Sequence, residues 1–273
     1  MKKNDPVNDL NCITSVTPTI CKLMNVIPLS CSDGNIIQSL LEKAELKHIS
    51  QIEKCLIYAP DAIGVNLHKK HPHIFTDILQ HAPDQVKLCS VFPPKTPVCF
   101  ASMFTGVMPD IHGIQKYKKP VLKCDTLFDA LIRGGKKVAI VAVANSSIDC
   151  IFRNRNIDYF SEIYDKQVTS RAIQLIEANK HDVIVAYHQE YDDTLHKSTP
   201  ESEAAIKAVK NHVDSFVKIA KHYEIAWEKY NRLIMFTPDH GAHIDPDTGK
   251  GTHGKDIPED MEIYHYYNVA NGK

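Results

Sequence analysis

The chain has 273 residues, of which 43% are hydrophobic, and this is enough for one sizeable α/β core or two small domains. Its 32 basic and 33 acidic residues give a formal net charge of -1, without a basic block or an acidic tail, so a nucleic acid polymer is not an expected partner. No apolar run approaches the length of a membrane span, so a membrane is not an expected partner either.

Cysteine usage and the N-terminal segment bear on the compartment. Residues 1–11 are polar and lack the apolar core of a signal peptide. The 8 cysteines are scattered without a CxxC pair, and Cys99 stands between Val98 and Phe100, an apolar setting typical of a buried thiol. A disulfide framework is the alternative, but it is less typical of a chain of this size. We therefore expect free thiols and a cytoplasmic location.

The first half of the chain reads as short strands alternating with helices. The hydrophobic pattern predicts a strand over 54–60, a helix over 74–81, a strand over 85–92, a helix over 97–104 and an amphipathic helix over 126–132. Asp61 follows the first strand directly. Thr96 is expected to cap the helix over 97–104, because Pro97 suits the first helical position. Gly134 and Gly135 end the last one.

The second half continues the alternation. Strands are predicted over 137–144, 181–187 and 233–236, and helices over 170–177 and 201–230. Because no Gly/Ser/Pro-rich linker divides the chain, we expect a single domain over 1–273, with its core at about 54–260. Strands alternating with helices predict an α/β fold with a mostly parallel central sheet and helices on both faces.

Several chemically active side chains follow the predicted strands. They are Asp61, Thr96, Asp192, Asp239 and His240. Ligands bind at the carboxyl ends of the strands in open α/β sheets, so residues far apart in sequence are expected to gather at this edge.

Carboxylates and imidazoles among these residues suit a metal site. Asp192 and His196 are four positions apart, which places both on one face of a helical turn. His253 lies between glycines that let the backbone bend close to a site. The candidates are three carboxylates and three imidazoles, a mixed set that suits Zn²⁺ and tolerates Mn²⁺: Asp61, Asp192, Asp239, His196, His240 and His253.

Each pattern by itself has a simpler explanation. An isolated Asp-x-x-x-His is usually a solvated helix face, Asp-His-Gly after a strand is often a turn, and a Thr before Pro is most often a helix cap. Four further histidines are expected to be structural or exposed: His112, His188, His243 and His265.

The order of the motifs favours function over these explanations. A strand ending in Asp61 precedes the segment from Thr96 to Ile114, which contains Thr-Gly and His-Gly-Ile, and then come Asp-x-x-x-His, Asp-His-Gly and Gly-Thr-His-Gly. This order, over about 54–260, resembles the alkaline phosphatase superfamily. It is closest to the branch of nucleotide pyrophosphatases and phosphodiesterases.

The resemblance implies a metal-dependent hydrolase of phosphate esters with two divalent ions, zinc being favoured over manganese. It matches Asp61, Thr96, Asp239 and His240 to the ligands of one ion, with Thr96 also the nucleophile of a phospho-threonine mechanism. Ligands of the other ion match Asp192, His196 and His253. Asp193 competes with Asp192, which we prefer because the family pattern places Asp four residues before His.

The chain departs from the family pattern in one segment. Phosphodiesterase relatives carry an Asn shortly after His-Gly-Ile, where it binds a phosphoryl oxygen. Here Gln115, Lys116 and Tyr117 occupy the stretch, and Lys116 or Tyr117 is the expected replacement in substrate binding. We expect a small phosphate ester as the partner, with a phosphodiester or nucleotide-type substrate favoured over a monoester or a phosphonate. The oligomeric state is left open.

Three alternatives are kept beside this reading. A phosphomutase of the same superfamily normally carries a large inserted domain, for which there is no room between Thr96 and Asp192. A sulfatase needs Cys or Ser in a Cys/Ser-x-Pro-x-Arg pattern, which this chain lacks. A metal-binding protein without turnover is the third, although all seven expected ligand residues are present.

Overall fold

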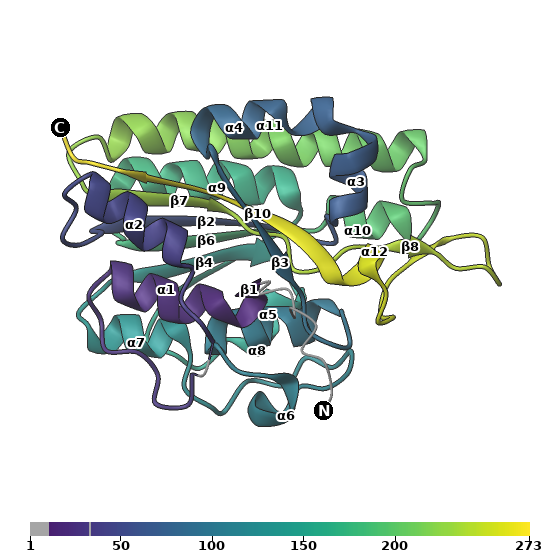
Figure 1. Ribbon diagram of the computed structural model, residues 1–273, viewed down its shortest axis with the longest axis horizontal. Coiled ribbons are helices and arrows are strands. Elements are labelled where there is room, and N and C mark those ends of the chain that lie inside the picture. Colours follow the sequence, from purple (N-terminus) through teal and green to yellow (C-terminus); the bar gives the residue numbers. More distant parts are fainter. Residues whose placement is uncertain (1–10, 33) are drawn as a thin grey trace, which may run out of the picture.

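The computed structural model describes residues 11–32 and 34–273, arranged around one eight-stranded sheet (Figure 1). The expected polar segment 1–11 falls outside these residues except for Asn11. Strand order across the sheet is β1-β3-β10-β7-β2-β6-β4-β5. The strands are β1 Asn11–Cys12, β2 Lys54–Pro60, β3 Asp84–Cys89, β4 Val138–Val143, β5 Asp158–Glu162, β6 Val183–His188, β7 Arg232–Phe236 and β10 Glu262–Ala270. A two-stranded ribbon pairs β8 His243–Ile244 with β9 Gly251–Thr252.

All strands of the large sheet run parallel except β10, which pairs antiparallel with both β3 and β7. Every residue of β2, β4, β6 and β7 is buried, as expected for central strands covered on both faces. Alternate β2 side chains enter two different cores. Cys55 and Ile57 point into one, and Leu56 and Tyr58 into the other.

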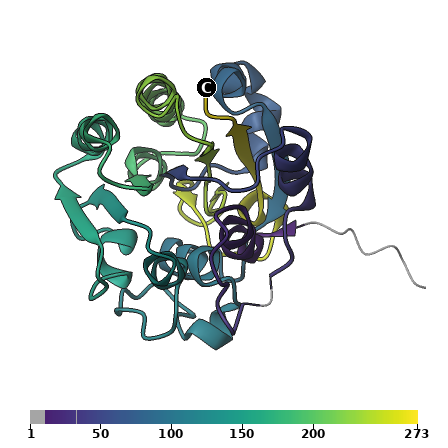
Figure 2. The same ribbon diagram turned by 90° about the vertical axis from the view of Figure 1, so that its left-hand side faces the viewer.

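Helices cover both faces of the sheet. The first core packs against α1 Val16–Leu23, α2 Gln38–Leu46, α5 Thr96–Thr105, α7 Leu127–Arg133 and α8 Ser147–Ile151. The second packs against α3 Val65–Lys70, α4 Thr76–His81, α9 Asp165–Ala178, α10 Glu190–Leu195 and α11 Glu203–Ala226. Shorter elements are η1 Ile13–Ser15, η2 Pro72–Phe75, α6 Pro109–His112 and α12 Pro258–Met261. Figure 2 shows the two helical layers with several helices seen nearly end-on.

The predicted α/β architecture, a mostly parallel sheet with helices on both faces, is confirmed. Observed β2 coincides with the predicted strand over 54–60. The sheet and its helices also extend beyond the expected core of 54–260, because α1 and α2 pack on one face and β10 fills the place between β3 and β7. The sequence of β10 mixes polar and aromatic residues, and its hydrophobic pattern does not predict a strand.

The position of Thr96 differs from the expected cap. Helix α5 begins at Thr96 itself, Lys95 is the N-cap, and no side chain caps the helix. The cap explanation for Thr96 is therefore wrong. Its hydroxyl bonds no backbone N–H of the helix and points elsewhere.

The strand order decides which loops meet. β2 lies between β7 and β6 and runs parallel to both, so the segments that follow these three strands emerge at the same edge. Those segments begin at Asp61, Thr237 and Gln189.

Among the described residues, no helix combines the length and the apolar character of a membrane span.

The thiols offer a test of the core. All 8 cysteines are free, with Cys21, Cys55 and Cys99 buried and Cys31 exposed, so the expectation of burial fails for Cys31. Burial raises the pKa of the Cys21 thiol to about 12 and that of Cys99 well above its usual value.

In native protein we expect a maleimide to modify Cys31 quickly and the buried Cys21, Cys55 and Cys99 slowly, as followed by mass spectrometry. A reductant should leave the Tm unchanged. A large loss of stability in reductant would contradict the free-thiol structure and the cytoplasmic location, which stays a prediction.

Candidate active site

The first cluster lies where β2 and β7 end. The Thr96 Oγ1 is 3.5 Å from Asp61 Oδ1 and 3.5 Å from His240 Nε2. His240 Nε2 is in turn 3.5 Å from Asp61 Oδ1 and 3.3 Å from Asp239 Oδ2. All four side chains are buried. Asp61 and His240 thus converge on the Thr96 hydroxyl, although they are 35 and 144 positions away from Thr96 in the sequence.

The start of α5 is held by its neighbours. Ser90 Oγ, after β3, donates to the Asp239 carbonyl at 2.6 Å and ties the approach to Thr96 to the end of β7. Ile114 N–H donates to His112 Nδ1 at 3.2 Å, so the other ring nitrogen carries the proton and donates to Ser102 Oγ at 2.9 Å. The expected His-Gly-Ile segment therefore braces α5 and does not enter the cluster.

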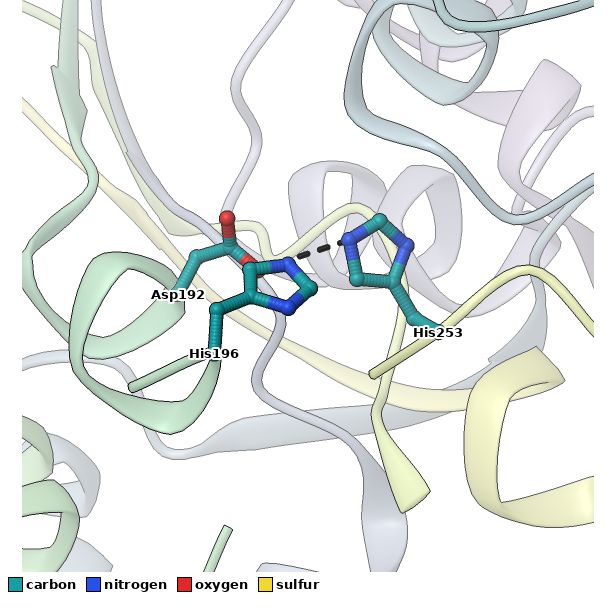
Figure 3. A group of neighbouring side chains, drawn as sticks. All are labelled: Asp192, His196 and His253. Carbon is teal, nitrogen blue, oxygen red and sulfur yellow. Dashed lines mark ion pairs between the residues drawn. The ribbon is translucent and has the colours of Figure 1, made fainter. Parts of the chain in front are cut away.

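The second cluster consists of Asp192, His196 and His253 (Figure 3). Asp192 and His196 come from one turn at α10, and His253 comes from the loop after β9. Asp192 Oδ1 is 3.3 Å from His196 Nε2 and 3.5 Å from His253 Nε2. The His253 ring stacks on His240 with centroids 4.0 Å apart, so the two clusters adjoin.

Hydrogen bonds define the tautomers of these three imidazoles. His196 Nδ1 lies 3.0 Å from the Gly251 carbonyl, His240 Nδ1 lies 2.9 Å from the Gly241 carbonyl and His253 Nδ1 lies 2.7 Å from the Pro94 carbonyl. A carbonyl only accepts, so each Nδ1 carries a proton and each neutral ring keeps its Nε2 lone pair for the site. Metal-binding histidines are held in this way.

The carboxylates also fit a cation. Asp192 Oδ1 and Asp239 Oδ2 are buried without a hydrogen-bond partner. Burial and the repulsion of Asp239 raise the pKa of Asp61 well above its usual value, and burial likewise raises the pKa of Asp239. Burial also disfavours the charged form of Asp192, but the adjacent His196 and His253, when their rings are protonated, outweigh it and lower the pKa of that carboxyl. Carboxylates buried this closely need a compensating positive charge, and oxygen and nitrogen ligands together suit a divalent metal.

Two buried side chains of other helices hold α10 at its N-terminus. Asp165 of α9 accepts from the Gln189 N–H at 3.0 Å and the Glu190 N–H at 2.9 Å. His212 of α11 accepts from the Tyr191 N–H at 3.1 Å through Nε2. These bonds satisfy the free donors of the helix start and set the direction in which the turn presents Asp192.

The structure separates Asp192 from its competitor. Asp193 accepts from the Tyr164 hydroxyl at 2.8 Å and from the Gln189 side chain at 3.2 Å, outside both clusters. Lys116 and Tyr117 are exposed, and Lys119 lies over the Tyr117 ring. Their expected part in substrate binding stays a prediction.

The four histidines expected to be structural or exposed lie outside both clusters. His188 and His265 are fully buried, His188 bonding Thr169 at 2.9 Å and His265 donating to the Pro238 carbonyl at 2.7 Å. His112 braces α5, and His243 bonds Asp260. The expectation that they are structural or exposed agrees with these positions.

Two residues near the site were missed in the sequence. The buried Tyr187 hydroxyl of β6 donates to Asp61 Oδ2 and leaves Oδ1 to face Thr96. Lys95 lies beside His253, because a Cβ on Gly254 would meet its Nζ at 2.9 Å. The role of Tyr187 depends on the direction in which its side chain leaves a buried strand. The hydrophobic pattern of a strand does not contain this direction.

A sequence model of the family described as type I phosphodiesterase / nucleotide pyrophosphatase matches residues 75–267. This is more than half of the chain. The chain belongs to this family. Membership confirms the predicted family. Asp61 lies outside the matched residues, so its place in the site depends on the geometry above.

Solved structures similar to this family member are ectonucleotide pyrophosphatase/phosphodiesterase 5 from mouse and human. An inactive threonine-to-alanine variant of the murine protein, in complex with AMP, has a TM-score of 0.56 at 17% identity. The human protein has a TM-score of 0.57 at 16% identity. Each match covers 70% of this chain and 57% of the other, so the chain spans little more than half the length of these proteins. At this identity the likeness shows the fold. No curated protein sequence matches the chain.

The buried carboxylates predict an unusual pH dependence of stability. The pKa of Asp61 is raised in the folded protein. An unfolded Asp has a pKa of about 4, so above this pH the unfolded chain binds fewer protons than the folded protein. Stability therefore falls as the pH rises through the folded pKa. In chelator, Asp61→Asn should therefore raise the Tm at pH 8 by about 2 °C or more, and less at pH 5. Excess zinc should reverse the order if Asp61 is a zinc ligand, because the variant would then bind the ion more weakly than the parent.

Asp193→Asn is the matched control, since it removes a carboxylate outside both clusters. It should show no gain that grows with pH. An Asp61→Asn variant less stable than the parent in chelator at every pH would contradict the picture of uncompensated charge.

Proposed function

We propose that this chain hydrolyses phosphate esters through a phospho-threonine intermediate on Thr96, with two divalent metal ions. The observation that carries the proposal is the position of the Thr96 hydroxyl. It lies at the start of α5, within 3.5 Å of one carboxylate and one imidazole that have no other evident reason to be buried together. Family membership supports the reaction class, since a diesterase family needs an activated nucleophile.

We propose zinc, in preference to manganese, as the metal at both clusters. Asp61, Thr96, Asp239 and His240 would hold one ion, and Asp192, His196 and His253 the other. The protonated Nδ1 atoms and the unpartnered carboxylate oxygens support this assignment. Bound ions would lower the pKa of a hydroxyl or water and neutralise phosphoryl charge.

The residues of the chain then act in two displacements. Thr96 Oγ1 gives its proton to solvent and bonds phosphorus, while the bond from phosphorus to the leaving oxygen breaks and that oxygen takes up a proton. Water next attacks the phospho-threonine, its oxygen bonds phosphorus, and the bond from phosphorus to Oγ1 breaks. A proton released by the attacking water restores the Thr96 hydroxyl. The positive end of the α5 dipole faces the phosphoryl group in both steps.

Backbone donors are fewer here than a helix start usually offers. Pro97 has no N–H, and the Val98 and Cys99 N–H groups both donate to the Lys95 carbonyl. The ammonium of Lys95, beside His253, is therefore the side chain that we propose to bind a phosphoryl oxygen of the substrate.

We favour a phosphodiester or nucleotide-type substrate. The nucleophile segment resembles the phosphodiesterase branch, and a structural neighbour is a complex with AMP. A phosphomonoesterase, a phosphonate hydrolase and a phosphomutase are the alternatives within the superfamily, and a metal-binding protein without turnover is the alternative from another class.

Thr96→Ala tests the nucleophile. We expect kcat to fall roughly 10³-fold or more, because the rest of the site does not replace a covalent nucleophile. Thr96→Ser should keep partial activity, since it keeps a hydroxyl. Steady-state kinetics on an aryl phosphodiester measures this, with circular dichroism to show that folding is unchanged.

Thr105→Ala is the matched control, because it removes a buried hydroxyl from the other end of α5. It should lower stability and leave kcat near the parent value. A metal-loaded Thr96→Ala protein that turns over at the parent rate would refute the mechanism. A metal-loaded parent without activity on any phosphate ester would favour the protein without turnover.

The substrate class has a direct comparison. Zinc-loaded protein should hydrolyse bis-p-nitrophenyl phosphate and a thymidine monophosphate aryl ester with a higher kcat/KM than p-nitrophenyl phosphate. The reason is that the nucleophile segment is similar to that of diesterases. Much higher kcat/KM on the monoester would overturn the preference for diesters and keep the reaction class.

A further inference from the structure

A buried carboxylate outside both clusters connects the loops that carry their histidines. Asp260 in α12 is fully buried. Its Oδ1 is 2.7 Å from His243 Nδ1, and its Oδ2 accepts from the Gly254 N–H at 2.8 Å and the Lys255 N–H at 2.9 Å. One side chain thereby ties α12 to β8 and to the residues that follow His253.

The backbone around Asp260 is packed equally closely. Its carbonyl accepts from the Gly241 N–H at 2.8 Å, directly after His240. A Cβ on Gly241 would meet the Glu259 carbonyl oxygen at 2.0 Å, and one on Gly64 would meet it at 2.9 Å. Only glycine at these two positions lets α12 approach so near, so the place of Asp260 depends on backbone contact.

We propose that Asp260 is a positioning residue for His253, and this inference rests on the proposed metal site. On its N-terminal side, His253 follows Thr252, which pairs with His243 in the small ribbon. On its C-terminal side, the Asp260 carboxylate holds the next two N–H groups. The ring itself is oriented by the Pro94 carbonyl and faces Asp192. Asp260 thus holds the segment from both sides, since its other oxygen bonds His243.

A carboxylate is needed for this arrangement. It offers acceptors on both oxygens, and three donors offset the cost of burying its charge. An Asn at this position would keep one acceptor oxygen and place an NH₂ group against either the His243 N–H or the two backbone N–H groups. Facing the two backbone N–H groups, the NH₂ group would be repelled; facing His243, it would force that ring into its other tautomer. In both cases the charge-assisted hydrogen bonds are lost and the hold on the loop of His253 weakens.

The effect should be confined to one metal. The side chain of Asp260 holds residues 254 and 255, whereas the bond to Gly241 uses the backbone carbonyl that an Asn keeps. Asp260→Asn should therefore weaken the site of Asp192, His196 and His253 and spare the site of Asp61, Asp239 and His240. A residue needed only for folding would weaken both.

The test is zinc titration against a competing chelator, which resolves two dissociation constants in the full chain. We expect Asp260→Asn to raise one of them 10- to 100-fold, the usual effect of removing a partner of a metal ligand, and the other less than about 3-fold. The adjacent Glu259→Gln is the matched control and should change neither. In an Asp192→Asn background, which removes the affected site, Asp260→Asn should have no further effect on zinc affinity.

The outcomes separate the inference from the proposed function. A parent that binds no zinc refutes the proposed function. A parent with two sites, both unchanged or both equally weakened by Asp260→Asn in a folded protein, overturns the role of Asp260. If the variant does not fold, hydrogen exchange in the parent decides. Slow exchange of the Gly254 and Lys255 amides supports the clamp, and exchange at the solvent rate overturns it.

Discussion

The close burial of Asp61 and Asp239 is the constraint on which the site depends. Both carboxylates follow central strands in a region shielded from water, and burial disfavours the ionisation of both. Asp239 further disfavours the ionisation of Asp61, and Asp192 further disfavours that of Asp239. Partial relief comes from the Tyr187 hydroxyl on Asp61 and from the Ala62 and His240 N–H groups on Asp239. A fold that keeps such a pair at its core bears a cost in stability, which a bound cation would remove.

Backbone carbonyls orient the imidazoles of the site, just as the strand ends position its carboxylates. The carbonyls of Gly251, Gly241 and Pro94 accept hydrogen bonds from Nδ1 of His196, His240 and His253, respectively. The orientation of the three imidazoles therefore depends on main-chain positions, and substitutions that move these segments would act on the proposed metal binding without touching a candidate ligand.

Distant helices contribute through α10. Asp165 and His212 come from α9 and α11, which cover one face of the sheet, and both bond the start of the turn that carries Asp192. The same packing that buries the second core thus sets the direction of a metal-ligand candidate. This coupling explains why a chain with a short α10 of Glu190–Leu195 can still present Asp192 in a defined way.

The sequence by itself determined the alternation of strands and helices, because hydrophobic periodicity records which residues are buried. It also determined the candidates at the strand ends, because motif order and the Asp-x-x-x-His spacing are local. The tertiary structure alone decided that Thr96 begins α5 with its hydroxyl toward Asp61 and that Asp192, not Asp193, meets His253. It also decided that Tyr187 bonds Asp61 and that Asp260 bonds the residue after His253. These contacts join residues far apart in the chain, and the direction of a side chain across such a distance is set by packing, which no local pattern contains.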